Sequence, residues 1–224
     1  MEEYKTAKSR RIIKQLIMTI VFLVIIIGGW HYPLLGYFIP LCMLLGIGIG
    51  FFKGRMWCNW LCPRGSFFDI LIKPISPKKK IPIFFKGLPL RIGILSILML
   101  VMTIQIIKNW PDPYKIGMFF VIFLTISTIL GIILALILHQ RTWCCICPIG
   151  SMVNWIGKRK YPLTIDSKLC MECKLCYKAC PIQIAPFDFK QSGLDIVRDS
   201  DCLKCGLCVS ACPKGALELN RDKR

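Results

Sequence analysis

The most informative part of the sequence is a pair of similar cysteine runs. Residues 170–181 read CMECKLCYKACP, and residues 202–213 read CLKCGLCVSACP. In each run three cysteines stand three positions apart, a fourth follows four positions later, and a proline comes next. Cysteine thiolates at this spacing hold 4Fe–4S clusters, each of which needs four of them. The two runs therefore predict two clusters, which exchange single electrons.

In the bacterial two-cluster ferredoxin pattern, each run gives three ligands to one cluster and its fourth cysteine to the other. The first predicted ligand set is Cys170, Cys173, Cys176 and Cys212. The second predicted ligand set is Cys202, Cys205, Cys208 and Cys180. This exchange brings the clusters close enough for electrons to pass between them. A zinc ribbon does not fit, because its cysteines come as separated pairs.

Four apolar stretches are long enough to cross a bilayer as helices, which takes about 20 residues. They run from about 12 to 30, 33 to 52, 88 to 107 and 116 to 138. The chain of 224 residues is 55% hydrophobic, more than is usual for a soluble domain. The first stretch has no Ala-x-Ala-like cleavage site, so we interpret it as a retained helix and not as a signal peptide.

The distribution of charge predicts the orientation in the membrane. The formal net charge is +18, and basic residues gather before the first stretch and between the second and third. The two other connections carry only Lys108 and Lys115. The positive-inside rule therefore predicts a multi-pass protein of the inner (cytoplasmic) membrane with both termini in the cytoplasm. Contact with anionic membrane lipid accounts for much of the charge, so we expect no nucleic-acid binding.

The two predicted helix pairs end in similar motifs. Residues 55–66 read RMWCNWLCPRGS, and residues 141–151 read RTWCCICPIGS. Both contain Arg-x-Trp-Cys and Cys-Pro-x-Gly-Ser, with one residue fewer between the outer cysteines of the second motif. We interpret this as a tandem duplication of a helical hairpin with its Cys motif.

The repeat predicts a third 4Fe–4S cluster that bridges the hairpins, because two cysteines from each half make the required four. Its predicted ligands are Cys58, Cys62, Cys144 and Cys147. Turns at the motif glycines would aim backbone amides at the cluster, and Arg55 and Arg141 would add positive charge. A zinc site or plain structural thiols are the alternatives. We regard Cys145 as spare, or as a substitute for its neighbour, and Cys42 as a packing residue.

The expected fold is a mainly α membrane protein with an α+β ferredoxin domain. Residues 1–66 and 92–157 form the two transmembrane hairpins with their Cys motifs. Residues 67–91 form a basic cytoplasmic loop with a short interfacial helix that starts after Ser66. Residues 158–224 form the cytoplasmic ferredoxin domain, with the boundary near 158–160. Its lysines predict a docking face for an acidic electron carrier or redox subunit: Lys168, Lys174, Lys178, Lys204 and Lys214.

Four helices, paired Cys-Pro motifs and a C-terminal two-cluster ferredoxin resemble the NapH-type membrane polyferredoxins, a group related to the membrane portion of NosR. The resemblance extends from Arg11 to Leu219. Cys58 and Cys62 match the first family motif, and Cys144 and Cys147 match the second with one residue fewer. The resemblance implies electron transfer between the quinone pool or cytoplasmic donors and partner redox proteins.

We therefore expect a membrane-anchored electron-transfer protein with three 4Fe–4S clusters and no catalytic residues of its own. It would serve a larger membrane redox complex as a subunit or partner, with quinone as one candidate for electron exchange. Two alternatives remain open: an accessory electron donor for maturation or reactivation of a metalloenzyme, and an iron–sulfur redox sensor. Haem is not expected, because His31 and His139 lie at opposite ends of the predicted helices.

Overall fold

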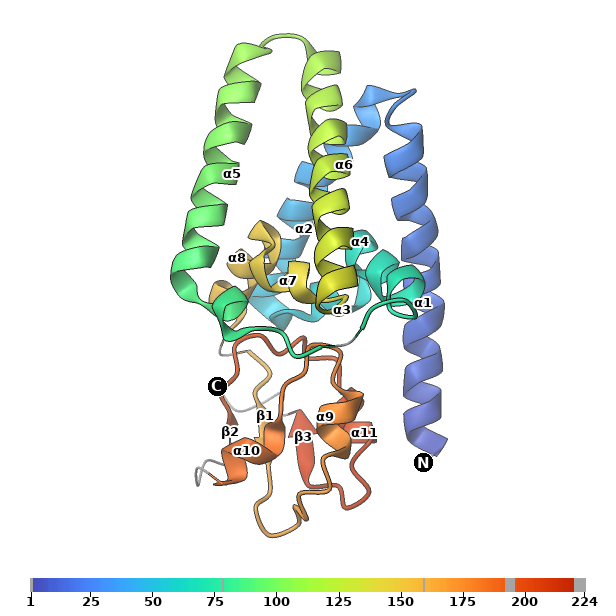
Figure 1. The fold of residues 1–224 in the computed structure, drawn as a ribbon, viewed down its shortest axis with the longest axis vertical. Coiled ribbons are helices and arrows are strands. Elements are labelled where there is room, and N and C mark those ends of the chain that lie inside the picture. The colour runs from blue at the N-terminus through green and yellow to red at the C-terminus, as the bar shows by residue number, and fades with distance from the viewer. Residues whose placement is uncertain (1, 78, 159, 192–195, 220–224) are drawn as a thin grey trace.

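We describe a computed structural model over residues 2–77, 79–158, 160–191 and 196–219. Lys78 of the predicted basic loop, Arg159 at the predicted boundary and the last five residues of the predicted ferredoxin domain lie outside the described residues. Four helices are long and apolar enough to cross a membrane (Figure 1). They are α1 (Glu2–Gly28), α2 (Phe38–Lys53) together with the helical turn that leads into it from Pro33, α5 (Leu88–Lys108) and α6 (Pro113–Ile137).

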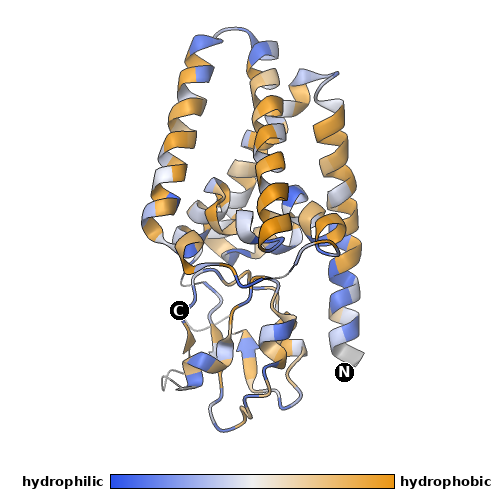
Figure 2. Ribbon diagram, viewed as in Figure 1, coloured by the Kyte–Doolittle hydropathy of each residue, from blue (hydrophilic) through white to orange (hydrophobic). Residues whose placement is uncertain are grey.

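The helices agree with the four predicted apolar stretches except at the start of α1. We expected the first span to begin near residue 12, but α1 is helical from Glu2. Its basic first turns extend past the apolar region and lie alongside the C-terminal domain (Figures 1 and 2). Both α5 and α6 begin with a proline at the first or second helical position, where the missing N–H costs no hydrogen bond. Few side chains of α5 are buried, as expected for a helix that faces lipid.

The turn between α1 and α2 packs tightly on α6. It contains the short helix η1 (Pro33–Tyr37). A Cβ atom on Gly36 would lie 2.2 Å from the carbonyl oxygen of Gly117, and one on Gly117 would lie 2.3 Å from that of Pro33. Glycine is therefore needed on both sides of this contact, since any side chain would collide with backbone.

Several short helices form a layer at the base of the long helices (Figure 1). From the first Cys motif come α3 (Met56–Trp60), α4 (Pro63–Phe67) and the π-helical turn η2 (Phe68–Ile72), followed by η3 (Ile83–Lys86). From the second come α7 (Thr142–Ile146) and α8 (Pro148–Gly157). The segments after the two motifs pack on helices of both hairpins. Helix α8 packs on α2, where Val153 contacts Gly50, and η2 packs on α6, where Phe68 contacts Gly131.

The predicted interfacial helix differs from the observed one in both start and position. We expected it to begin after Ser66, but α4 begins at Pro63, because Cys62 caps it and accepts a hydrogen bond from the Gly65 N–H. The turn η2 that follows is not spread on the surface. Its residues Phe68, Asp69 and Ile72 are buried between α1 and α6.

The C-terminal domain is ferredoxin-like, with a small antiparallel sheet of order β2-β1-β3. The strands are β1 (Leu163–Ile165), β2 (Ile196–Val197) and β3 (Leu217–Leu219). The short helices are α9 (Leu175–Ala179), α10 (Pro186–Gln191) and α11 (Leu207–Ser210). Leu163 pairs with both Val197 and Leu219, and its side chain is buried with Ile182 in the domain core.

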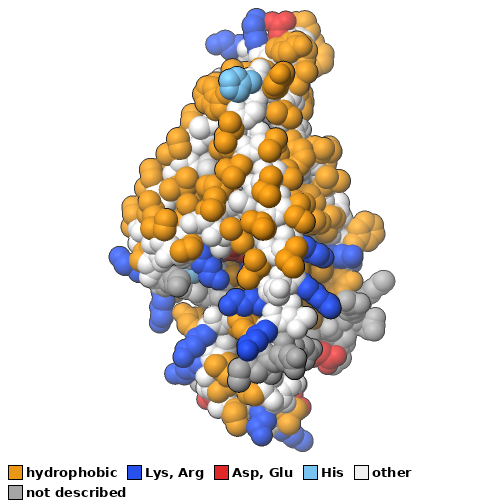
Figure 3. Space-filling view, turned by 90° about the vertical axis from the view of Figure 1, so that its right-hand side faces the viewer, with side chains coloured by type: hydrophobic (Ala, Val, Ile, Leu, Met, Phe, Trp, Pro, Cys, Tyr) orange, Lys and Arg blue, Asp and Glu red, His pale blue; other side chains and the backbone are white. Residues whose placement is uncertain are grey.

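Side-chain chemistry changes along the long axis of the molecule. In Figure 3 the long helices present a hydrophobic surface, while Lys and Arg gather around the short helices and the C-terminal domain. Figure 1 places the N-terminus of α1, the segment between α2 and α5, and the C-terminal domain at the same end of the long helices. The basic end is therefore the end that carries the cysteines.

Candidate iron–sulfur sites

The structure gathers the twelve cysteines of the predicted ligand sets around three pockets. The membrane-side group lines the first pocket and consists of Cys58, Cys62, Cys144 and Cys147. The distal group lines the second and consists of Cys170, Cys173, Cys176 and Cys212. The proximal group lines the third and consists of Cys180, Cys202, Cys205 and Cys208. Each group has the composition that the spacing predicts, and the ligation of iron by each thiol stays a prediction.

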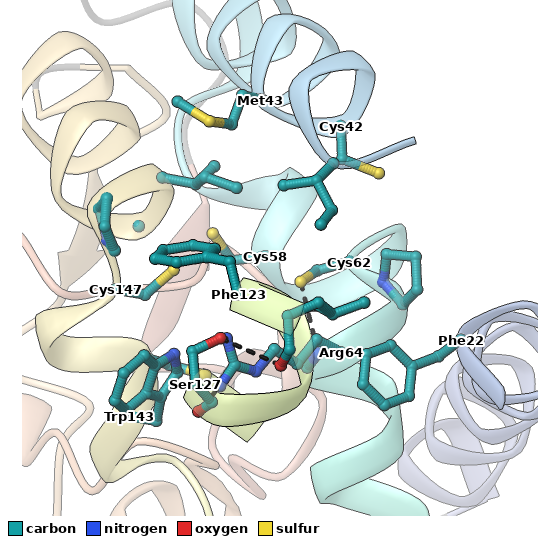
Figure 4. A pocket seen from close by; sticks show the side chains of 18 of the residues that line it. Phe22, Cys42, Met43, Cys58, Cys62, Arg64, Phe123, Ser127, Trp143 and Cys147 are labelled. Carbon is teal, nitrogen blue, oxygen red and sulfur yellow. Dashed lines mark hydrogen bonds between the residues drawn. The ribbon is translucent and has the colours of Figure 1, made fainter. Parts of the chain in front are cut away.

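The membrane-side group surrounds a cavity of about 130 Å³ at the base of the long helices (Figure 4). This is roughly ten times the space that one buried water needs. Apolar side chains from α1, α2 and α6 also line it, among them Phe22, Met43 and Phe123. Arg64 crosses from the first Cys motif to α6, where it donates to the backbone and hydroxyl oxygens of Ser127.

Backbone and arginine N–H groups approach the sulfur atoms of this group. The Gly65 N–H donates to Cys62 Sγ at 3.4 Å, and Arg141 Nη1 donates to Cys144 Sγ at 3.6 Å. A Cβ atom on Gly65 would lie 2.9 Å from Arg141 Nη1, and one on Gly150 would lie 2.9 Å from the Cys144 carbonyl oxygen. Donors of this kind stabilise an anionic cluster by hydrogen bonding to its sulfurs. Because the two motif glycines have no side chain, Arg141 and the backbone of Cys144 can approach them closely.

Two buried arginines connect the Cys motifs reciprocally. Arg55 of the first motif donates from Nη2 to the carbonyl oxygen of Cys144 at 3.0 Å. Arg141 of the second motif donates from Nη1 to the carbonyl oxygen of Cys58 at 3.1 Å. The two side chains are 2% and 0% exposed. The arginine of each motif therefore binds the carbonyl oxygen of the first cysteine in the other motif. This places the expected positive charge next to the membrane-side group.

Asp69 balances part of this charge, and sequence reasoning missed it. Arg141 Nε donates to its Oδ1 at 2.9 Å, and Arg11 and Gln15 of α1 donate to its Oδ2. Although burial opposes ionisation, Arg141 and Arg11 hold the pKa of Asp69 well below its usual range. A signal was present: Asp69 is the only acidic residue between Glu3 and Asp112.

The two ferredoxin-like runs share one backbone conformation. Positive φ angles occur at matching positions of the two runs: at Glu172 (+56°), Lys174 (+61°) and Gln183 (+58°), and at Lys204 (+53°), Gly206 (+74°) and Gly215 (+63°). Only a few per cent of non-glycine residues adopt positive φ, and such strain concentrates at functional sites. A residue with positive φ next to one with negative φ turns consecutive N–H groups inward, and this forms a concave site for an anion.

Matching N–H groups also reach the fourth cysteine of each run. The Ile184 N–H donates to Cys180 Sγ at 3.3 Å, and the Ala216 N–H donates to Cys212 Sγ at 3.4 Å. Burial raises the pKa of the Cys180 thiol to about 12. Without iron this thiol therefore stays protonated at neutral pH, and iron binding has to displace its proton.

The arrangement of the thiols favours clusters over zinc. Within the described ranges no three His, Cys, Asp or Glu side chains stand close enough to hold one metal ion. A structural zinc site needs four donors that converge at about 2.3 Å on a single ion. A 4Fe–4S cluster takes one thiolate on each iron, so its ligands stand further apart. The donor set therefore fits the cluster.

The remaining cysteines divide between the core and the cavity. Cys145 is 1% exposed and lies outside the lining of the membrane-side cavity, next to the core that Trp57 and Leu203 share. Cys42 of α2 lines the cavity, although the sequence placed it only as a packing residue. His139 is buried and accepts a hydrogen bond from the Arg141 N–H at its Nδ1.

Two family models match the segments that carry the cysteines. A family model described as a 4Fe-4S binding domain matches residues 35–82 and 116–164, and each match contains one Cys motif. A model described as a 4Fe-4S dicluster domain matches residues 146–216, which contain both ferredoxin-like runs.

Two curated proteins of Methanocaldococcus jannaschii are similar to this chain. They are the uncharacterised protein MJ0749, 23% identical over 63% of this chain, and the uncharacterised protein MJ0750, 29% identical over 58%. The chain spans 57% and 60% of their lengths, respectively. No solved structure matches. With its 4Fe-4S binding domains, the chain is an iron–sulfur protein, and such domains transfer electrons through their clusters.

Proposed function

We propose that the protein is a membrane-anchored electron-transfer protein with three 4Fe–4S clusters, one in each cysteine group. The observation that carries this proposal is the division of twelve cysteines into three groups of four around separate pockets. The resemblance to the NapH-type polyferredoxins, which rests on the paired Cys-Pro motifs and the two-cluster ferredoxin, agrees with this arrangement. The protein then acts as a subunit or partner of a larger membrane redox complex.

The structure supports an order of electron transfer through the three groups. In the distal group Cys173 is exposed, and its neighbour Met171 is 58% exposed, so a partner in solution can approach there. The proximal group lies against the membrane portion: burial raises the pKa of Cys205, and the nearby Arg11 guanidinium from α1 partly offsets the rise. Leu203 of the same run shares a core with Trp57 and Cys58. We infer the order distal, proximal, membrane-side.

The charge distribution supports the cytoplasmic side of the inner membrane for both termini and for the cysteine groups. The Lys and Arg side chains gather at the end that carries the C-terminal domain, as the positive-inside rule requires of a cytoplasmic face (Figure 3). The reducing cytoplasm also keeps cluster thiols available.

Lysines near the distal group support an acidic electron carrier or redox subunit as partner. Lys174 follows the exposed Cys173, and Leu175 beside it is 42% exposed. Lys204, which we expected on the docking face, is buried instead beside the proximal group and cannot contribute to that face. A basic rim with an apolar centre steers an acidic partner electrostatically and then holds it. Reduction by such a partner should slow steeply with added salt, and a rate independent of salt would remove this part of the proposal.

The cavity that the membrane-side group lines is also lined by apolar side chains of the long helices, and this apolar part supports quinone as a candidate for exchange at that end. Its lining includes Phe38 of α2 and Met102 of α5, together with Arg64 from the first Cys motif. A quinone needs an apolar pocket with a few polar groups near its carbonyl oxygens. Reoxidation of the dithionite-reduced protein by a quinone analogue in stopped flow tests this, and no reoxidation above the buffer rate would exclude it.

Iron counting tests the three-cluster proposal. Protein purified anaerobically should be brown and contain about twelve irons per chain, since each cluster holds four. Cys62→Ser should lose about four irons and keep the EPR signals of the ferredoxin-like domain. The matched control is Cys42→Ser, which alters a cavity cysteine outside the predicted ligand sets and should keep all the iron. Unchanged iron in Cys62→Ser, or zinc in place of iron, contradicts the proposal.

A further inference from the structure

The two Cys motifs and the residues that follow them differ at two charged positions. Arg64 of the first motif corresponds to Ile149 of the second, and the other difference lies after the motifs. Asp69 lies seven residues after Cys62, and the residue seven positions after Cys147 is Asn154. The first motif thus carries its own carboxylate, whereas the second carries a neutral amide at the matching position.

The arginines that would bind the missing carboxylate are nevertheless present. Asp69 is held by Arg11, from the first helix of its own hairpin, and by Arg141, from the other Cys motif. The matching pair for the second motif is Arg91, from the first helix of the second hairpin, and Arg55, from the first Cys motif. This pair has no acidic partner within the membrane portion that the structure describes.

Both arginines instead bind Asp201 of the C-terminal domain. Arg55 Nη1 donates to Asp201 Oδ1 at 2.8 Å, and Arg91 Nη2 donates to Oδ2 at 2.7 Å. Asn154 Nδ2 donates to Oδ1 at 2.9 Å, so the amide at the neutral position points at the same carboxylate. The carboxylate therefore comes from another domain and lies beside Asn154, the neutral residue that corresponds to Asp69.

Burial makes this contact energetically important. The side chains of Arg55, Arg91 and Asp201 are 2%, 4% and 5% exposed. Loss of Asp201 would leave two guanidinium groups buried without a carboxylate, which is far more unfavourable than the loss of a surface ion pair. Arg55 also donates to the carbonyl oxygen of Cys144, and Cys202 directly follows Asp201. The Arg55 side chain thus connects Cys144 of the membrane-side group to the residue next to Cys202 of the proximal group.

We propose that Asp201 supplies the counter-charge that the second Cys motif lacks, so that Arg55 and Arg91 are neutralised only when the C-terminal domain is docked. Asp201 is then a positioning residue that keeps the proximal group against the membrane-side group. The docking role depends on no cluster, whereas its consequence for electron transfer rests on the proposed function.

Hydrogen–deuterium exchange of the intact holoprotein in detergent tests the docking role. In Asp201→Asn the amides of residues 199–203 and of α8 should exchange roughly a hundredfold faster, because a broken buried ion pair favours the undocked state. The strands β1 and β3 should keep their protection. The matched control is Asp69→Asn, the same change within the membrane portion, which should leave the protection of residues 199–203 unchanged.

A double variant asks whether the charge, and not the local contact, matters. Asn154→Asp combined with Asp201→Asn moves the carboxylate to the position that the repeat assigns and keeps an amide–carboxylate pair. Protection of α8 should return to within about threefold of wild type, since the arginines regain a carboxylate. The proposal is overturned if Asp201→Asn leaves protection unchanged, if it exposes β1 and β3 equally, or if the double variant exchanges as fast as the single one.

The electron-transfer consequence has a separate readout. Asp201→Asn should keep the iron content of wild type but transfer electrons more slowly from the proximal to the membrane-side signals in rapid-freeze EPR. A wild-type transfer rate together with lost protection would overturn the link to electron transfer and leave docking intact. An iron content far below twelve in the unaltered protein would instead count against the proposed function.

Discussion

Replacement of Arg141 by glutamine should lower the reduction potential of the membrane-side cluster. Arg141 is fully buried, with Nη1 at 3.6 Å from Cys144 Sγ. A fixed positive charge so close to a ligand favours the extra electron of the reduced cluster. Its loss leaves Asp69 still bound by Arg11 and Gln15, so the substitution does not strand a buried carboxylate. The change therefore acts mainly on the charge at the cluster.

The size of the effect follows from Coulomb's law. Two unit charges about 4 Å apart interact by about 4 kcal/mol at an effective dielectric constant of about 20. The added electron spreads over a cluster whose centre lies beyond the sulfur, so we expect about half of this, ~2 kcal/mol. At about 1.36 kcal/mol and 59 mV for each tenfold change, this corresponds to a shift of roughly −90 mV.

A redox titration followed by EPR measures the shift. The signal of the membrane-side cluster is identified as the one that Cys62→Ser removes. The matched control is Lys190→Gln: Lys190 Nζ donates to the Cys170 carbonyl oxygen at 2.9 Å, but its side chain faces solvent, where water and salt screen its charge. The reasoning is refuted if Arg141→Gln shifts the membrane-side signal by less than about 20 mV, or upward, or no more than Lys190→Gln shifts the distal one.

Three further predictions follow from single contacts. Cys145→Ser should keep all the iron, whereas Cys144→Ser should lose about four irons, and the opposite result would exchange their roles. Gly157→Ala should destabilise the protein by about 1–3 kcal/mol in thermal unfolding, because its Cβ would lie 2.5 Å from the Gly54 Cα, and Gly93→Ala on the open face of α5 is the control. Asp69→Asn should cost about 3–5 kcal/mol at neutral pH. The depressed pKa of Asp69 means that this loss stays constant between pH 6 and 8 and shrinks only below about pH 4, near the ordinary carboxyl pKa; a loss that varies across the neutral range would count against the ion pair.

The cysteine groups and the long helices were predictable because their signals are local. Thiols three or four positions apart are brought together by one turn of backbone, and a run of about twenty apolar residues makes a membrane helix without reference to its neighbours. The combination of distant segments into one group was predicted from the repeated motifs and from the two-cluster ferredoxin pattern, and not from local spacing. The start of α1 was predicted less well, because its first turns are polar and helix continues where apolar periodicity ends. The helix after the first Cys motif was placed too late, because a cysteine cap and a proline mark its start.

The sequence alone thus accounts for which residues could hold iron and which segments could enter the membrane, since both depend on short-range spacing and composition. It does not reveal how the buried charges are matched. Arg55 and Asp201 are separated by 146 positions, and Arg11 and Asp69 by 58. These pairs form only when the long helices, the short helices and the C-terminal domain pack together. Packing removes the charges from water, and a buried charge is stable only beside an oppositely charged partner.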